Sequence, residues 1–152
     1  MSLKKYQQKR KFAKTPEPKG KEIKKSLSRF VIHKHRASHL HWDLRLELDG
    51  VLKSWAVPKE PPVKTGIKRL AVRVEDHPVG YIDFKGTIPK GNYGAGQVEI
   101  WDQGKFSLLN RSINEISFLL SGRRLKGRYL LIKPKGSRFG RKAWLFFKRE
   151  NK

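Results

Sequence analysis

Histidine, aspartate and arginine side chains lie close together in residues 34–50, which read KHRASHLHWDLRLELDG. Apolar and polar residues alternate strictly over positions 39–49, and this period of two is typical of a half-buried β-strand. Alternate side chains of a strand share one face, so we expect His41, Asp43 and Arg45 side by side on a surface. Their apolar neighbours would point into a core.

This row of side chains predicts a metal site. Adjacent same-face positions lie about 7 Å apart, so one ion between His41 and Asp43 can take a ligand from each. His35 is expected to reach the same ion from the preceding turn. Two imidazoles and one carboxylate favour Mn²⁺ or Zn²⁺ and leave coordination positions open for water or substrate. We expect His33 and His39 to be bystanders.

Three further features are candidates for contact with phosphate. Arg45 can bind a phosphate through two nitrogen atoms, and its alternative role is an ion pair with Asp43 or Glu47. His77, in the sequence VEDHP, is expected at a strand end, where its alternative role is to cap a turn. The glycine-rich run at 86–97 leads into a strand and not into a helix, which favours a tight loop over a phosphate cradle.

The charge of the chain predicts a polyanionic partner. The 152 residues include 36 Lys and Arg but only 13 Asp and Glu, so the net charge is +23. Residues 1–29 carry a net charge of +9 and residues 105–152 carry +12, whereas residues 30–104 carry only +2 and hold all five His. Nucleic acid is the partner that such an excess favours. We therefore expect basic flanks that bind nucleic acid on both sides of the reactive residues.

The composition also excludes several classes of protein. The absence of Cys excludes disulfides, Cys-ligated zinc, iron–sulfur clusters and thiol nucleophiles. No apolar run approaches the roughly 20 residues that span a bilayer. The N-terminal sequence MSLKKYQQKRKFAK lacks the apolar segment of a secretory signal. We expect a cytoplasmic protein that does not bind membranes.

Short alternating segments predict a mainly β fold, a single-domain antiparallel barrel or sandwich of about eight strands with short helical segments. Residues 1–29 are expected to form an irregular basic arm, and residues 30–152 the barrel. Asp49-Gly50 predicts a two-residue hairpin turn, and 112–120 is ambiguous between helix and strand. Beyond the strand at 39–49, strands are predicted at 51–57, 69–75, 81–84, 97–101, 105–109, 128–133 and 143–148.

Three long motifs resemble the 3′-phosphoesterase module of bacterial ATP-dependent DNA ligase D, which also occurs as a stand-alone protein. They read RFVIHKHRASHLHWDLRLELDGVLKSWAVPK, RLAVRVEDHPVGY and GTIPKGNYGAGQVEIWD. The resemblance covers nearly the whole chain and includes the TPEP sequence of the arm. It implies a β-barrel enzyme that uses Mn²⁺, or another metal such as Zn²⁺ or Co²⁺, to remove a 3′-phosphate or a terminal 3′-ribonucleoside from DNA ends.

The resemblance also implies roles for individual residues. The metal ligands of the family match His35, His41 and Asp43. Its phosphate-contacting and catalytic positions match Arg45, Lys59, Arg69, His77 and Tyr81. In the arm, residues that support ribonucleoside removal match Arg10 and Glu17, and we expect Lys14 to bind nucleic acid beside them. A separate ligase, polymerase and Ku-like end-binding protein would act in trans.

One position of the arm departs from the family. Where the family commonly has Arg-Asp-Phe, this chain has Arg10-Lys11-Phe12, so a basic side chain replaces an acidic one. A lysine beside a phosphodiester favours binding but removes an acidic group from the nuclease step. We therefore expect phosphate removal to be better preserved than ribonucleoside trimming.

Two other functions fit the same composition. A non-enzymatic nucleic-acid-binding barrel would share the basic flanks, but it does not need the acidic and histidine residues gathered between positions 35 and 77. A metal-dependent phosphodiesterase for free nucleotides or RNA would share the site and use its basic flanks for solubility. Cleavage of a mononucleotide phosphate, compared with a duplex that has a recessed 3′ end, separates this second function from a DNA-end enzyme.

Overall fold

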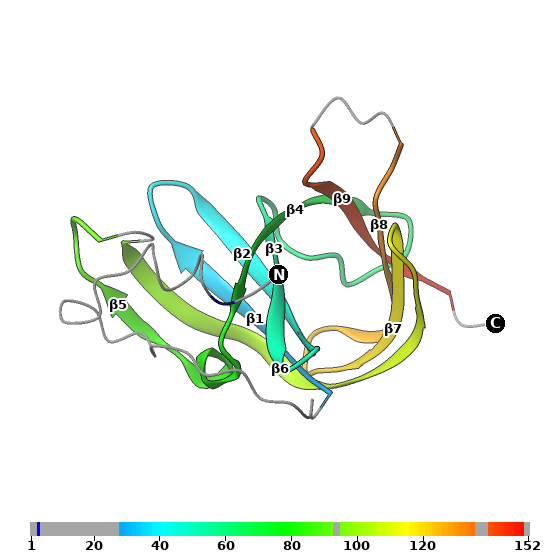
Figure 1. The fold of residues 1–152 in the computed structure, drawn as a ribbon, viewed down its shortest axis with the longest axis horizontal. Coiled ribbons are helices and arrows are strands. Elements are labelled where there is room, and N and C mark those ends of the chain that lie inside the picture. The colour runs from blue at the N-terminus through cyan, green and yellow to red at the C-terminus, as the bar shows by residue number, and fades with distance from the viewer. Residues whose placement is uncertain (1–2, 4–27, 93–94, 136–139, 151–152) are drawn as a thin grey trace.

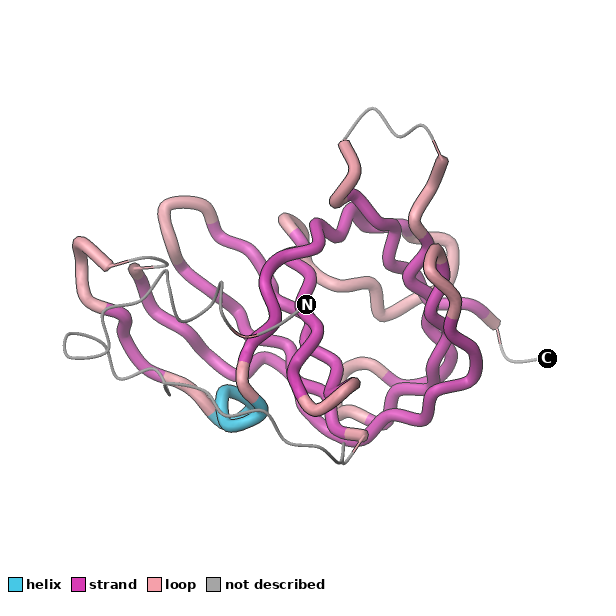
Figure 2. Tube along the Cα trace, viewed as in Figure 1, coloured by secondary structure: helices cyan, strands magenta, loops and turns pink. Residues whose placement is uncertain are grey.

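The computed structural model describes residues 3, 28–92, 95–135 and 140–150. Within these ranges the chain forms nine strands and one short 3-10 helix (Figures 1 and 2). In chain order they are β1 (Arg29–Arg36), β2 (Leu40–Leu48), β3 (Val51–Val57), β4 (Lys68–His77), η2 (Val79–Asp83), β5 (Gly86–Ile88), β6 (Gly96–Arg111), β7 (Glu115–Ser121), β8 (Lys126–Ile132) and β9 (Ala143–Arg149). In these ranges no helix has the length and hydropathy needed to cross a membrane.

Eight of the strands close into an antiparallel barrel, as the sequence predicted. The sheet runs in the order β1-β2-β3-β4-β9-β8-β7-β6-β5, and β1 also pairs with β6. This last pairing closes the ring and leaves β5 beside the first residues of β6 (Figure 1). The β1–β2 hairpin, β5 and the start of β6 extend to one side of the ring.

The barrel interior is filled by apolar side chains that alternate along the strands. On β2 they are Trp42, Leu44, Leu46 and Leu48, all less than 9% exposed. Aromatic residues of β3, β7, β8 and β9 complete this core, among them Trp55, Phe118, Tyr129 and Phe146. The alternation seen in the sequence therefore does select the inward face of β2.

The opposite face of β2 is also buried, which corrects the expectation of a half-buried strand with an exposed polar row. Tyr81 and Ile82 of η2 pack outside the barrel against Val31 and Leu52, and form a second, smaller apolar cluster. Every residue of β2 from Trp42 to Leu48 is buried as a result. The polar row thus lies between the barrel wall and an outer layer.

The tight turn between β2 and β3 is confirmed. Asp49 and Gly50 have φ values of 56° and 78°, the left-handed conformations that a two-residue hairpin turn requires. This turn sets the register in which Asp43 pairs with Ala56 and Arg45 pairs with Ser54. It therefore decides which residues of β3 lie beside the polar row.

The structure bears on three other predictions about elements. Tyr81–Phe84 was predicted as a strand, which is wrong: a helical turn begins after Pro78, where the amide of Tyr81 donates to the Pro78 carbonyl. The strands predicted at 97–101 and 105–109 are one continuous strand, β6. The ambiguous segment 112–120 contains most of strand β7, which ends at Ser121.

Of the predicted arm at 1–29, only residues 3, 28 and 29 are described, so its boundary stays a prediction.

We expect Gly104→Ala to destabilise the barrel. Gly104 lies where β6 passes from β1 to β7, and a methyl group on its Cα would collide with the backbone carbonyl of Ser121. Overpacking of this kind costs about 1–3 kcal/mol of unfolding free energy, which urea denaturation measures. Ser107→Ala, on an exposed position of the same strand, is the control. An unchanged urea midpoint for Gly104→Ala would contradict the close approach of Gly104 to the Ser121 carbonyl.

Candidate metal centre

His35, His41 and Asp43 come together on the outer face of the β1–β2 hairpin. His35 is directly opposite His41 in the register, and Asp43 follows on the same face of β2. The ring centroids of the two histidines are 4.8 Å apart. His35 therefore reaches the cluster from strand β1 and not from the turn before β2, which corrects that detail of the sequence prediction.

The three side chains direct their donor atoms toward a common point. Asp43 Oδ2 lies 3.2 Å from His41 Nε2 and 3.8 Å from His35 Nδ1. His41 Nδ1 lies 3.0 Å from the carbonyl oxygen of His39, and a carbonyl can only accept, so Nδ1 carries a proton. In the neutral ring, Nε2 then turns a lone pair toward the carboxylate oxygen. A proton or a cation must lie between these two atoms.

This donor set suits a divalent metal ion. One ligand atom from each residue lies within 4.8 Å of the others. Ligand atoms bound at about 2.1 Å to one ion lie roughly 3–4 Å apart, which is close to the separations found here. Two nitrogen ligands and one carboxylate match the preferences of borderline divalent metals. His35 and Asp43 are buried and His41 is partly exposed, so the centre is open on one side.

The local charges keep Asp43 ionised. Burial by itself raises the pKa of Asp43, but the positive charge of Arg45 and the hydrogen bonds with His35 and His41 hold this pKa well below its usual range. For His41, burial lowers the pKa, while the hydrogen bond to Asp43 and its negative charge outweigh burial, so the pKa is raised. The carboxylate is thus negative wherever the protein is folded near neutral pH.

Arg45 is buried beside the cluster and is held by several partners. Its Nη2 lies 3.4 Å from Asp43 Oδ2, and its Nη1 donates to Ser54 Oγ at 2.8 Å. Nη1 also lies 3.3 Å from His77 Nδ1, and Nε donates to His33 Nδ1 at 3.1 Å. A guanidinium has five N–H groups, so these contacts leave one N–H of Nη2 for another acceptor. The ion pair with Asp43 that the sequence suggested is therefore present, and Glu47 pairs with Arg29 instead.

His33 is not a bystander, which corrects the sequence prediction. It is fully buried and accepts the Nε–H of Arg45, so its ring is neutral. Burial first, and then the positive charge of Arg45, lower the pKa of His33 to about 3. The missed signal was spacing: His33 lies two residues before His35 and therefore shares its face of β1.

His77 and Tyr81 close the other side of the site. His77 is the last residue of β4, as predicted, and its Nδ1 lies 3.0 Å from the Glu75 carbonyl as well as near Arg45. Tyr81 lies on η2, with its ring 4.8 Å from the His77 ring and 5.0 Å from the Arg45 guanidinium carbon. The Tyr81 ring, which is part of the outer apolar cluster, therefore covers the buried arginine.

A cavity of about 330 Å³ joins these residues. Its lining includes the three candidate metal ligands, Arg45, His77 and Tyr81. Glu75 also lines it, although the sequence prediction did not select this residue. Ser54, the partner of Arg45, was missed as well. A serine opposite Arg45 in a strand gives no sequence signal until the hairpin register is known.

The remaining predicted residues lie elsewhere. Lys59 is exposed after β3, and Arg69 is near the start of β4, where its Nε donates to the Glu60 carbonyl at 2.8 Å. Neither lines the cavity. The sheet pairs Asp43 with Ala56, and Ala56 with Val72. Arg69 is three residues from Val72 along β4, so its backbone lies about 10 Å along the strand direction from Asp43. Arg10, Lys14 and Glu17 lie outside the described residues.

Residues 33–133 match the family described as the DNA ligase D 3′-phosphoesterase domain. The chain is 50% identical over 139 residues to the multifunctional non-homologous end joining protein LigD of Pseudomonas aeruginosa, covering 86% of this chain and 16% of that protein. It is 47% identical over 153 residues to LigD of Mycolicibacterium smegmatis, covering 92% of this chain and 19% of that one. The Mycobacterium tuberculosis protein is 44% identical over 143 residues, with 90% and 19% covered.

The chain thus spans less than a fifth of the length of these relatives. The matched segment begins at His33 and contains the histidine and aspartate cluster, Arg45, His77 and Tyr81. The family match and the site therefore lie in the same part of the molecule. On this match and on relatives of 44–50% identity, the chain belongs to the DNA ligase D 3′-phosphoesterase domain family.

Proposed function

We propose that this protein is a metal-dependent phosphoesterase that removes 3′-phosphate from DNA ends and leaves a 3′-hydroxyl for repair. The observation that carries this proposal is the joining of His35, His41, Asp43 and Arg45 in one cavity. A metal donor set beside a fixed guanidinium provides positive charge on two sides of a phosphoryl group. A protein that only binds nucleic acid needs neither.

The residues of the cavity have different roles in the proposed reaction. A bound Mn²⁺, or Zn²⁺ or Co²⁺ in its place, would polarise a phosphoryl oxygen and lower the pKa of a bound water. His35, His41 and Asp43 hold the ion. The remaining N–H of Arg45 Nη2 binds another phosphoryl oxygen and offsets its charge.

His77 is our candidate for protonating the departing O3′ atom. Its Nδ1 has two neighbours of opposite kind, the Glu75 carbonyl, which can only accept a hydrogen bond, and Arg45 Nη1, which can only donate one. When Nδ1 accepts from Arg45, the proton of the neutral ring is on Nε2. Tyr81 contacts the His77 ring edge to face and lies against the Arg45 guanidinium, and these contacts keep His77 and Arg45 in this arrangement.

DNA is the proposed substrate because of the charge and the relatives. The net charge of +23 favours a polyanion, and the relatives are named as non-homologous end joining proteins. Lys59 and Arg69, outside the cavity, are proposed to contact the nucleic-acid backbone, together with Arg10, Lys14 and Glu17 of the arm. Ligase, polymerase and Ku-like proteins are proposed as partners, in the cytoplasm.

Loss of one metal ligand tests the central part of this proposal. We expect His41→Ala to abolish phosphate release from a 3′-phosphorylated primer annealed to a longer template, and a chelator to abolish it in the unchanged protein. His39→Ala, two residues away and exposed, should retain full activity. Phosphate release is measured with a labelled primer and Mn²⁺. Normal turnover by His41→Ala would refute the metal assignment, and DNA binding without turnover in the unchanged protein would favour a pure binding function.

Replacement of Arg45 by Lys tests the role of the guanidinium. A lysine keeps the charge but cannot reach His33, Ser54 and Asp43 at once. We expect kcat to fall by about 100-fold or more, the range found when one donor to a developing oxyanion is removed. The matched change Arg149→Lys, at an exposed position of β9, should leave kcat unchanged. If Arg45→Lys retains kcat while its circular dichroism is native, the guanidinium does not stabilise the transition state.

The departure at Lys11 predicts a change in the ratio of two activities. We expect 3′-phosphate to be removed faster than a terminal 3′-ribonucleoside, because a basic residue stands where the family commonly has an acidic one. Lys11→Asp should raise ribonucleoside removal relative to phosphate removal. End-group analysis of primers that carry each terminus measures both rates in one assay. An unchanged ratio in Lys11→Asp would show that this position does not control the second activity.

A further inference from the structure

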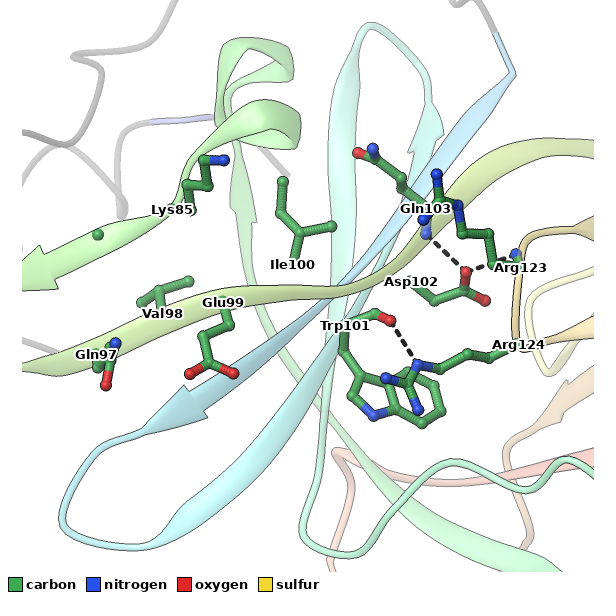
Figure 3. Close-up of a pocket in the computed structure, with 11 residues that line it drawn as sticks. Lys85, Gln97, Val98, Glu99, Ile100, Trp101, Asp102, Gln103, Arg123 and Arg124 are labelled. Carbon is green, nitrogen blue, oxygen red and sulfur yellow. Dashed lines mark hydrogen bonds between the residues drawn. The ribbon is translucent and has the colours of Figure 1, made fainter.

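A second concave region lies beside β5 and β6. It is a groove of about 690 Å³ along β6, lined also by Lys85 and by Arg123 and Arg124 of the β7–β8 turn (Figure 3). Gly86 of β5 lines this groove, whereas Ile88 of the same strand lines the cavity at the metal centre. The groove and the cavity therefore both border on strand β5.

The groove follows an open edge of strand β6. On the edge away from β1, β5 pairs with β6 at residues 96–98 and β7 pairs from residue 105 onward. Between them, at 99–104, no strand of the described ranges covers this edge. Arg124 Nε donates to the exposed carbonyl of Trp101 at 2.9 Å, one of the backbone groups on this edge. The open edge thus leaves room for an extended ligand.

Asp102 fixes the position of the arginine-bearing turn. Its carboxylate is buried and accepts the amides of Arg123 at 2.8 Å and of Leu125 at 2.9 Å, in addition to the amide of Gln103. The two hydrogen bonds from Arg123 and Leu125 hold the turn against β6. The two arginines are therefore presented from a rigid backbone, although their side chains are exposed.

Arg124 and Trp101 form a flat cationic platform in this groove. The Arg124 guanidinium carbon lies 4.7 Å from the centre of the Trp101 ring, and Figure 3 shows the guanidinium over the indole. Trp101 is partly exposed, whereas the other three tryptophans are each less than 9% exposed. Guanidinium and indole planes of this kind are surfaces on which unpaired bases stack.

The groove keeps a net positive charge, because both of its acidic residues are already engaged by other groups. Its two acidic residues already have partners: Glu99 lies 3.7 Å from Arg36 Nε, and Asp102 binds backbone amides. Lys85, Arg123 and Arg124 remain as three cations along one face. Cations with an aromatic platform favour a single-stranded nucleic acid over an acidic peptide, because a peptide offers charge without flat rings to stack.

We propose that this groove binds the unpaired strand beside the DNA end on which the metal centre acts. Val98, which lines the groove, is paired with the metal-ligand candidate His35 across β1 and β6. One strand spacing, about 5 Å, thus separates Val98 from His35, and Trp101 lies three residues, about 10 Å, further along β6. A recessed 3′ end in the cavity places the overhanging template strand within reach of Trp101. This inference rests on the proposed function and adds a preference for ends with an overhang.

Binding can be tested without any reaction. Single-stranded oligothymidylate with 3′-hydroxyl ends, added in the presence of a chelator, should quench tryptophan fluorescence as the groove fills. We expect Arg124→Ala to weaken this binding about tenfold, the loss of roughly one stacked base. Arg124→Lys, which keeps the charge, should weaken it about threefold. Arg149→Ala removes an equal charge from β9, outside the groove, and should match the unchanged protein.

The same variants should alter substrate preference. With 3′-phosphorylated DNA, the unchanged protein should have a lower KM for a recessed end with a template overhang than for a blunt end. Arg124→Ala should remove this difference without changing kcat on the blunt end. Equal binding by Arg124→Ala and Arg149→Ala would overturn the proposal, as would equal quenching by polyglutamate of the same charge. Failure of phosphate release alone would refute the proposed function but not the binding result.

Discussion

The buried contact between Arg45 and Asp43 is the interaction on which the site depends. Both residues are at most 5% exposed, and an unpaired charge in such a position is strongly destabilising. The guanidinium is compensated by Asp43, His33 and Ser54 together. The same ion pair keeps Asp43 negative, so that it can bind a cation with the two histidines. Each charge thus makes burial of the other tolerable, and the cavity gains a fixed anion and a fixed cation.

The barrel wall has two faces, and the contact between Arg45 and Asp43 lies on the outer one. Its inner face is a conventional apolar core, and it leaves the polar residues of β1 and β2 outside the ring. The outer layer, made by η2 with Tyr81 and Ile82, then excludes water from Arg45 without filling the space above His41. A partly exposed candidate metal ligand beside a buried arginine is the result. The groove lies along the open edge of β6 between its pairings with β5 and β7.

Much of the fold could be predicted because it depends on local patterns. The alternation along β2 gives both its strand character and the shared face of His41, Asp43 and Arg45, and Asp49-Gly50 predicts the turn. The errors concern contacts between distant segments. Burial of the outer face of β2 depends on η2, more than 30 positions later, and a helical turn in Tyr81–Phe84 gives no clear period. The hydrogen bonds of Arg45 to His33 and Ser54 follow from the strand register, which residue types alone do not specify.

The central claim is that His35, His41 and Asp43 hold one divalent metal ion within reach of Arg45. Anomalous X-ray diffraction from crystals grown with Mn²⁺ measures this most directly, because it locates the ion independently of activity. We predict a single strong peak bonded to one atom of each of the three side chains, on the side of Asp43 away from the barrel core. A peak bonded to other residues, or an ion that binds without Asp43, would contradict the account.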